Sequence, residues 1–406
     1  MPRPYLVRVV ATILVAIASA VVFAAADPGD ARAARERIAA IGGAAACVVD
    51  AEGRVTEITI PDGSSVTAED VTLFGRLTDL VKLRILDCRA LDDDMVAALS
   101  GLKHLQVLAL TNTGITDAGA RTIADSFPGL VELDLSSNTN LTGAAMKSIA
   151  SLVKLERLSL VQTRFNDLQT RRLGKLVELQ ALDLRGNMEA GDLTLAVVAG
   201  LPRLRGFKHR STIVSDEGLA ALAHSTSLEA LLAQDFAITN ASGAHLAAIP
   251  SLTSLEMFRC QGFGTDGVVA LGPLKKLSRL TLRDLPEVGD PALAVLGELP
   301  ALERLTLHEL ASVGDEGLAH LAAARSLVVL DIWSLPKMTD RSLDAIASLP
   351  KLRELSIRET GVSEAAVDKI LAMPNLTTLT LKNGALSPEA VARLSARKWA
   401  KLDIAR

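Results

Sequence analysis

The sequence predicts an α/β solenoid, a horseshoe of stacked repeat units with a parallel β-sheet on its concave face and helices on its convex face. A pattern, L-x-x-L-x-L with occasional apolar substitutes, recurs fifteen times along the 406 residues. Neighbouring copies start 23 to 25 residues apart. A unit of this length cannot bury its own leucines and has to stack on its neighbours. The unit starts are Val55, Leu80, Leu105, Leu130, Leu155, Leu179, Leu204, Leu228, Leu252, Leu277, Leu302, Leu327, Leu352, Leu376 and Trp399.

Prolines mark the end of the helix in several units. A proline stands two residues before the unit start, where a helix has to stop because proline cannot continue its hydrogen bonding. These prolines are Pro128, Pro202, Pro250, Pro300, Pro350 and Pro374. Pro291 and Pro388 instead follow Asp290 and Ser387 at the first helical position, which proline tolerates.

Acidic or amide side chains mark the start of the helix. In eight units such a residue follows the last apolar position of the loop by two, where its oxygen is expected to cap the free N–H groups of the helix that follows. These residues are Asp93, Asp117, Asp167, Asp216, Asn240, Asp290, Asp315 and Asp340. Each unit is therefore expected to form a short strand, a turn and an apolar-striped helix such as DEGLAALAHS at 216–225.

Residues 1–26 are expected to form a signal peptide. Arg3 and Arg8 precede an apolar run, and the alanines at 24–26 supply a small-residue cleavage site. An uncleaved anchor is the alternative, because the apolar stretch of 18 residues reaches the short end of the roughly 17 to 25 that span a bilayer. Both interpretations predict an exported chain that is periplasmic, held in the cell envelope or secreted, with membrane contact only through an uncleaved N-terminal segment.

The remaining chain divides into two predicted parts. Residues 27–54 are expected to cap the first strand, with a glycine-stopped helix at 31–45. Residues 55–406 are expected to form the repeat domain. The sequence reaches Arg406 just after the last strand pattern without a polar capping unit, so this edge could also support end-to-end self-association.

The repeat resembles the leucine-rich repeat family over about nine-tenths of the chain. The phrase that contains ITDAG, VSDEGL and VGDEGL is similar to the cysteine-containing class found in F-box substrate receptors and in many exported bacterial proteins. The resemblance implies the horseshoe fold, and solenoids of this kind use the concave surface for partners. An F-box adaptor is disfavoured because 27–54 is too short for its helical domain.

The ninth place of the unit, usually Asn or Cys in that family, varies along the chain. It holds Cys88, Thr113, Asn138, Thr163, Asn187, Thr212, Phe236, Cys260, Leu285, Leu310, Leu335, Thr360 and Gly384. Polar members are expected to satisfy backbone groups in the turn, and apolar members to pack. Cys88 and Cys260 are expected to be core residues that cannot pair, since seven strand spacings of about 4.8 Å separate them.

Composition and motifs disfavour several function classes. The formal net charge is -4, whereas general nucleic-acid binding needs a basic footprint. The six histidines lack H-E-x-x-H spacing, and the sequence contains no G-x-S-x-G, phosphate-binding glycine loop or Asp-rich calcium loop. The sequence therefore predicts no enzyme, no metal and no cofactor.

The candidate binding residues are those that the repeat leaves free. Counted from the first leucine, places four and six point into the core, so places three, five and seven alternate onto the concave sheet. The later units carry cations and two large aromatics in these columns, and Trp and Arg are frequent interface anchors. The predicted partner-binding residues are Arg185, Arg210, Phe258, Arg279, Arg283, Arg304, His308, Trp333, Arg358 and Lys382.

Two functions fit these observations. The first is a non-catalytic, exported protein-binding scaffold that recognises an acidic protein or a glycan on the concave face. The alternative is a structural cell-envelope component that acts through self-association without a specific ligand. The arginines could also serve only to keep the sheet solvated, through ion pairs with Glu256, Asp284, Asp331, Glu354 and Glu359.

Overall fold

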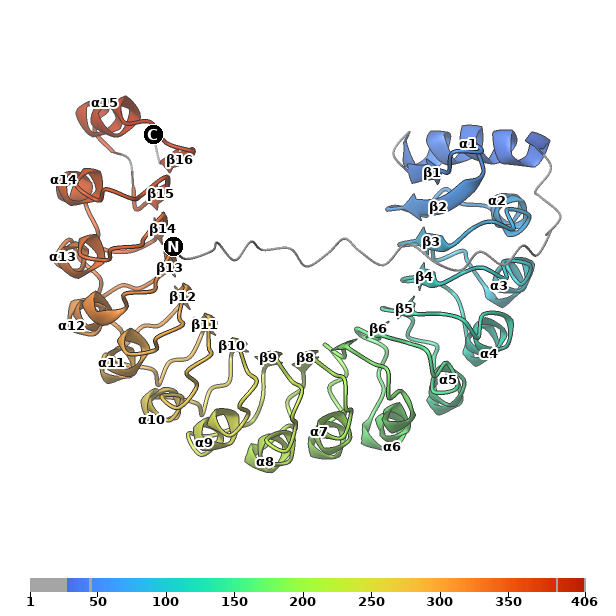
Figure 1. Cartoon of the computed structure of the whole chain (residues 1–406), viewed down its shortest axis with the longest axis horizontal. Coiled ribbons are helices and arrows are strands. Elements are labelled where there is room, and N and C mark those ends of the chain that lie inside the picture. Colours follow the sequence, from blue (N-terminus) through green and yellow to red (C-terminus); the bar gives the residue numbers. More distant parts are fainter. Residues whose placement is uncertain (1–27, 44–45, 385, 405–406) are drawn as a thin grey trace, which may run out of the picture.

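The computed structural model describes residues 28–43, 46–384 and 386–404, and it confirms the predicted horseshoe (Figure 1). In these residues sixteen strands form one sheet in sequence order. The first two strands pair antiparallel and every later pair is parallel. The strands line the inner side of the arc and the helices its outer side (Figure 1). The predicted signal segment, 1–26, lies outside the described residues.

The strands are β1 Cys47–Val49, β2 Val55–Ile60, β3 Lys82–Ile85, β4 Val107–Leu110, β5 Glu132–Asp134, β6 Arg157–Ser159, β7 Ala181–Asp183, β8 Gly206–Arg210, β9 Ala230–Gln234, β10 Ser254–Phe258, β11 Arg279–Arg283, β12 Arg304–His308, β13 Val329–Trp333, β14 Glu354–Arg358, β15 Thr378–Lys382 and β16 Lys401–Ile404. The α-helices are α1 Pro28–Gly42, α2 Ala68–Gly75, α3 Asp93–Ala98, α4 Asp117–Ser126, α5 Gly143–Ile149, α6 Asp167–Thr170, α7 Asp192–Ala199, α8 Asp216–Leu222, α9 Ser242–Ala247, α10 Thr265–Val269, α11 Pro291–Gly297, α12 Asp315–Ala319, α13 Ser342–Ala347, α14 Val367–Leu371 and α15 Pro388–Ala396. Short 3-10 helices are η2 Arg171–Lys175, η3 His320–Ala323 and η4 Glu364–Ala366.

The strand leucines form one continuous core between the sheet and the helices. In β12, Leu305 and Leu307 are fully buried, whereas Arg304 and His308 alternate with them onto the opposite face. Because parallel neighbours keep one register, each column of equivalent places runs straight from strand to strand. The concave surface is therefore an array of columns whose residues can be read directly from the sequence.

The N-terminal helix covers the first strands. α1 runs from Pro28 to Gly42, so it begins and ends about three residues earlier than the span 31–45. Ala34 and Ile38 are fully buried in the common core. In the described part of the chain, no helix combines the length and the apolar character needed to cross a membrane.

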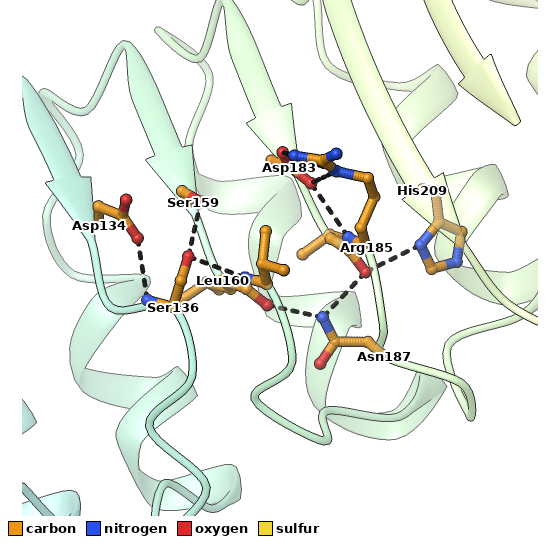
Figure 2. A network of polar contacts seen from close by, with 10 residues as sticks. Asp134, Ser136, Ser159, Leu160, Asp183, Arg185, Asn187 and His209 are labelled. Atoms are coloured by element: carbon orange, nitrogen blue, oxygen red, sulfur yellow. Dashed lines mark hydrogen bonds and ion pairs between the residues drawn. The ribbon is translucent and has the colours of Figure 1, made fainter. Parts of the chain in front are cut away.

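Polar residues at the ninth place of the early units form buried bridges between units. Nδ2 of Asn187 donates to the carbonyl oxygens of Leu160 and Leu184 at 2.7 and 2.9 Å. Its Oδ1 accepts the N–H of Phe165 at 2.8 Å and the hydroxyl of Thr163 at 3.1 Å. Figure 2 shows the amide of Asn187 held between these turns. The predicted role of the polar ninth place, satisfying backbone groups in the turn, is confirmed here.

The ninth place is apolar and packed in the five units from Phe236 to Leu335. Leu285, Leu310 and Leu335 are fully buried. Cys88 and Cys260 are buried free thiols, in agreement with the sequence. Burial raises the pKa of the Cys260 thiol to about 12, so this sulfur stays protonated and unreactive at neutral pH.

The aspartates at the helix starts cap a different helix from the one expected. Asp93 is the first residue of α3, and its Oδ1 accepts the N–H groups of Thr116 and Gly119 at the start of α4, at 2.8 and 2.9 Å. A side chain on Gly119 would collide with this carboxylate, which explains the glycine of the D-x-G phrase. The sequence prediction that each residue caps the helix of its own unit was wrong. Each helix start lies beside the free N–H groups of the next unit and caps those groups instead. The same inter-unit contact is made by Asp117, Asp167, Asp216, Asn240, Asp290, Asp315 and Asp340.

Candidate functional site on the concave face

Strand register brings most of the predicted site residues into one column. From β10 to β15, the direct neighbours in the parallel ladder are Phe258, Arg283, His308, Trp333, Arg358 and Lys382. Arg279 and Arg304 lie on the same face, four residues before Arg283 and His308. These eight residues are called the C-terminal stripe below.

Two predicted residues, Arg185 and Arg210, lie apart from the stripe. Arg185 donates to the carboxylate of Asp183 from Nε at 3.0 Å and from Nη2 at 2.7 Å. Arg210 donates from Nε to Asp235 at 2.5 Å. Gln234 of β9 stands between Arg210 and the first member of the stripe. The structure therefore does not unite these two cations with the other predicted residues.

Trp333 is the centre of the stripe. The guanidinium carbon of Arg283 lies 5.2 Å from the centre of the Trp333 ring, and that of Arg358 lies 5.7 Å from it. The imidazole of His308 meets the indole edge-on, with ring centres 5.6 Å apart and an interplanar angle of 84°. Cation–π contacts of this kind contribute about 0.5 to 1 kcal/mol at exposed sites. The indole is thus oriented by three polar neighbours while it stays half-buried.

Asp331 orients His308 and Arg358 from the adjacent place-five column. Its Oδ2 accepts from Nε2 of His308 at 3.0 Å, and its Oδ1 accepts from Nη2 of Arg358 at 3.0 Å. Burial disfavours the carboxylate, but the hydrogen bonds from His308 and Ser356 and the nearby positive charge outweigh that effect and lower the pKa of Asp331 to about 2. Asp331 is therefore ionised throughout the neutral range.

The other ion pairs of the stripe are open to solvent. Nε of Arg283 binds Glu309 at 2.8 Å, and Nζ of Lys382 binds Asp403 at 2.8 Å, with all four side chains about one-third exposed or more. Exposed pairs of this kind contribute only about 0 to 1 kcal/mol. An incoming carboxylate can therefore replace Glu309 or Asp403 at little cost.

Arg279 and Arg304 form an unneutralised pair of cations. They are direct cross-strand neighbours on β11 and β12, and both are exposed. Neither guanidinium has an acidic partner among the described residues. Like charges directly opposite one another destabilise a sheet. An external anion bound between these two side chains would reduce their repulsion.

The ion pairs differ from those expected for a purely solvated sheet. The predicted pair of Arg358 with Asp331 is present. Arg283, however, pairs with Glu309, whose positive φ of 56° follows from the left-handed turn that ends β12. The sequence did not indicate this partner, because the direction of a side chain in that turn depends on the backbone rather than on residue spacing.

A recess in the N-terminal half of the concave face was missed by sequence reasoning. It has a volume of about 280 Å³ and lies over β5 to β8. Its lining is Glu132, Leu133, Asp134, Arg157, Leu158, Ser159, Ala181, Leu182, Asp183, Gly206 and Lys208. The available signal was the missing side chains in the place-three column, where Ala181, Gly206 and Ala230 follow one another.

The concave face shows no arrangement typical of metal chemistry. In the part of the chain that the structure describes, no group of three or more His, Cys, Asp or Glu side chains could hold a metal ion. His209 is fully buried and its two ring nitrogens lie 3.1 and 2.8 Å from the carbonyl oxygens of Leu184 and Ala190. Burial lowers the pKa of His209, which therefore acts as a neutral core residue.

Comparison with known proteins decides the family. The leucine-rich repeat region family matches residues 120–385, and a second leucine-rich repeat family matches residues 101–124. The chain belongs to the leucine-rich repeat family. A search of curated proteins gave no significant match.

Solved leucine-rich repeat structures share the fold at low sequence identity. The chain is similar to an internalin (inlF) from Listeria monocytogenes, with 19% identity and a TM-score of 0.56 over 94% of this chain and 96% of that one. It also matches a plant peptide hormone receptor, RGFR1 in complex with RGF2, with 16% identity and a TM-score of 0.44 over 86% of this chain and 62% of that one. At 19% identity the likeness to the internalin shows the fold alone, and leucine-rich repeat folds are typical of protein-binding scaffolds.

Proposed function

We propose that the chain is a non-catalytic, exported protein-binding scaffold that docks an acidic segment of another protein on the C-terminal stripe. Membership of the leucine-rich repeat family supports the binding role, because the fold presents a long concave surface to partners. The charged start, apolar run and alanines within residues 1–26 support export.

The observation that carries the proposal is the pair Arg279 and Arg304. Like charges on directly neighbouring strands repel each other, and the repulsion is stronger near a protein surface than in bulk water. A carboxylate between the two guanidiniums converts this repulsion into two charge-assisted hydrogen bonds. Arg283 lies four residues further along β11, about 13 Å away. An extended segment with acidic residues four positions apart along this direction would therefore contact the Arg279–Arg304 pair and Arg283 together.

Trp333 supplies the apolar anchor of the proposed interface. Its ring is flanked by two guanidiniums whose acidic partners are partly exposed. A partner that covers the indole also shields these ion pairs from water and strengthens them. The combination suits a protein segment that carries both acidic and apolar side chains.

The proposal is tested by affinity capture from the envelope and secreted fractions of the source cell. The bait is the full chain, and the test variant is Arg279→Glu with Arg304→Glu. The matched control is Arg171→Glu with Lys175→Glu, which makes the same charge change on the convex helix η2. We expect a protein that the full chain and the control retain and that the test variant loses at least tenfold.

Three outcomes would contradict the proposal. Retention of the same protein by the test variant would remove the stripe from the interface. Capture of a sulfated glycan in place of a protein would change the class of partner. Concentration-dependent filaments of the chain without any captured partner would favour the structural envelope role.

A further inference from the structure

The recess over β5 to β8 is open because short side chains occupy its floor. Ala181 and Gly206 fill the place-three positions of β7 and β8, between Arg157 on β6 and the long side chain of Lys208. The lining residues come from four consecutive strands of one sheet, and Figure 2 shows Asp134, Ser159 and Asp183 from three of them. The recess therefore has a fixed frame and a floor that lies below the surrounding charged side chains.

Gly206 is not required by the backbone or by packing. A Cβ placed on Gly206 would meet no atom within 4 Å, and its φ lies outside the left-handed region. Glycine inside a strand costs roughly 0.5 to 1 kcal/mol relative to alanine, through its extra conformational freedom. The physical effect of Gly206 is thus to keep the recess open, at a small cost to stability.

Most of the charges around the recess are neutralised within the chain. Glu132 pairs with both Arg84 and Arg157, at 2.5 and 2.7 Å, and Arg157 also pairs with Glu156 at 3.5 Å, so two carboxylates balance the two guanidiniums. Asp183 is held by Arg185 at 2.7 Å. These pairs leave little charge on the Arg157 side of the recess and on Asp183 itself.

Two opposite charges remain at the two ends of the recess. The carboxylate of Asp134, on β5, accepts the N–H of Ser136 at 2.9 Å and has no cationic partner among the described residues. The exposed ammonium of Lys208, on β8, has no acidic partner in the same part of the chain. Three strand spacings separate β5 from β8, which corresponds to about 14 Å.

Hydrogen bonds hold the middle of the recess in place. The hydroxyls of Ser136 and Ser159 are 2.8 Å apart, and the Ser136 hydroxyl also accepts the N–H of Val161 at 3.2 Å. Figure 2 shows Asp134, Ser136, Ser159 and Asp183 along the ends of successive strands. The carboxylate at one end of the recess is therefore positioned before any ligand arrives, which lowers the entropy cost of binding.

We propose that this recess binds an extended peptide segment with a basic side chain and an acidic side chain four residues apart. An extended chain advances about 3.4 Å per residue, so residues i and i+4 span about 13 Å and point to the same side. The basic side chain pairs with Asp134, and the acidic side chain pairs with Lys208. The residue at i+2 lies between β6 and β7 and places a small or medium apolar side chain beside Ala181, while Gly206, two residues before Lys208 on β8, leaves the space through which the acidic side chain reaches Lys208. This site lies outside the C-terminal stripe and does not depend on it.

The test is calorimetric titration of the full chain with end-capped pentapeptides. The first peptide has lysine first, valine third and glutamate fifth, with serine between, and the second has lysine at both ends. We expect the full chain to bind the lysine–glutamate peptide at least tenfold more tightly than the lysine–lysine peptide. Lys208→Glu is expected to reverse this preference, since both ends of the recess are then acidic.

A second variant fills the recess without disturbing the fold. Gly206→Val is expected to weaken binding of the lysine–glutamate peptide at least tenfold while Tm stays the same or rises. Gly129→Val is the matched control, because a Cβ there also meets no atom within 4 Å and Gly129 does not line the recess. The proposal is overturned if the full chain binds neither peptide at millimolar concentration, if Gly206→Val binds normally, or if Lys208→Glu keeps the original preference.

Discussion

The two halves of the horseshoe use the same repeat in different ways. In the N-terminal half, buried polar side chains such as Asn138 and Asn187 join the turns, and the concave charges are largely paired around a recess. In the C-terminal half, Leu285 and Leu310 replace these amides, while the concave face carries Trp333 and exposed arginines. The buried ladder and the concave columns therefore vary independently, because alternation along each strand separates the two faces.

The largest expected effect comes from removing a buried amide. Asn187→Leu would remove the hydrogen bonds of the amide to the carbonyls of Leu160 and Leu184, and it would leave the buried N–H of Phe165 without a partner. A buried unsatisfied group costs about 1 to 3 kcal/mol and each lost hydrogen bond about 0.5 to 1.5 kcal/mol, so the free energy of unfolding should fall by roughly 4 kcal/mol. Urea unfolding followed by circular dichroism measures this change.

Leu310→Met is the matched variant at the equivalent place of the C-terminal half. A volume-conserving apolar change usually costs less than about 1.5 kcal/mol. Equal losses of stability in the two variants would contradict the distinction between a hydrogen-bonded ladder and a packed one.

Replacing either of two glycines by alanine should change the stability of the chain in opposite directions. A Cβ on Gly218, in α8, would collide with the carboxylate of Asp192, whereas a Cβ on Gly206 meets open space. Gly218→Ala should therefore destabilise the chain by roughly 1 to 2 kcal/mol despite the better helix propensity of alanine. Gly206→Ala should stabilise it by about 0.5 to 1 kcal/mol. Thermal unfolding of the two single variants checks the contrast, and shifts of the same sign would refute it.

The fold and the column of candidate residues were accessible from sequence, and the reason is periodicity. The leucine spacing gives the strand register, so the alignment of Arg283, His308, Trp333 and Arg358 follows directly. The partner of Arg283 and the helix capped by Asp93 were not accessible in this way. Both depend on how neighbouring units lie beside one another.

The recess also lay beyond sequence reasoning, for a different reason. It is created by the absence of side chains at Ala181 and Gly206. Sequence reasoning directed at reactive or charged residues passes over such positions. A column of small residues on an otherwise charged surface is the signal that could have located it.

A further difference between the halves is expected in their response to pH. The pKa of Asp331 is lowered from 3.8 to about 2, so its stabilising contribution is present above pH 4 and is lost as the pH falls toward 2. In the Asp331→Asn variant, the free energy of unfolding that is lost between pH 4 and pH 2 should be smaller by roughly 1 to 2 kcal/mol. In the N-terminal half, burial lowers the pKa of His209 below 6.5, so stability should already fall as the pH drops below 6.5.

Urea unfolding at a series of pH values separates these two windows. His209→Gln should remove the loss that begins as the pH drops below 6.5 and leave the Asp331 window unchanged. If Asp331→Asn instead alters the upper window, the assignment of the two groups is wrong.

The central claim is that the C-terminal stripe is the partner interface. The chain has two tryptophans, Trp333 within the stripe and Trp399 outside it, which makes one an internal reference for the other. The most direct measurement is oxidative footprinting of the chain with and without its captured partner, with mass spectrometry of both tryptophan peptides. Trp333 is expected to be oxidised at least fivefold more slowly in the complex, while the rate at Trp399 stays unchanged. An unchanged rate at Trp333 in the saturated complex would contradict the claim.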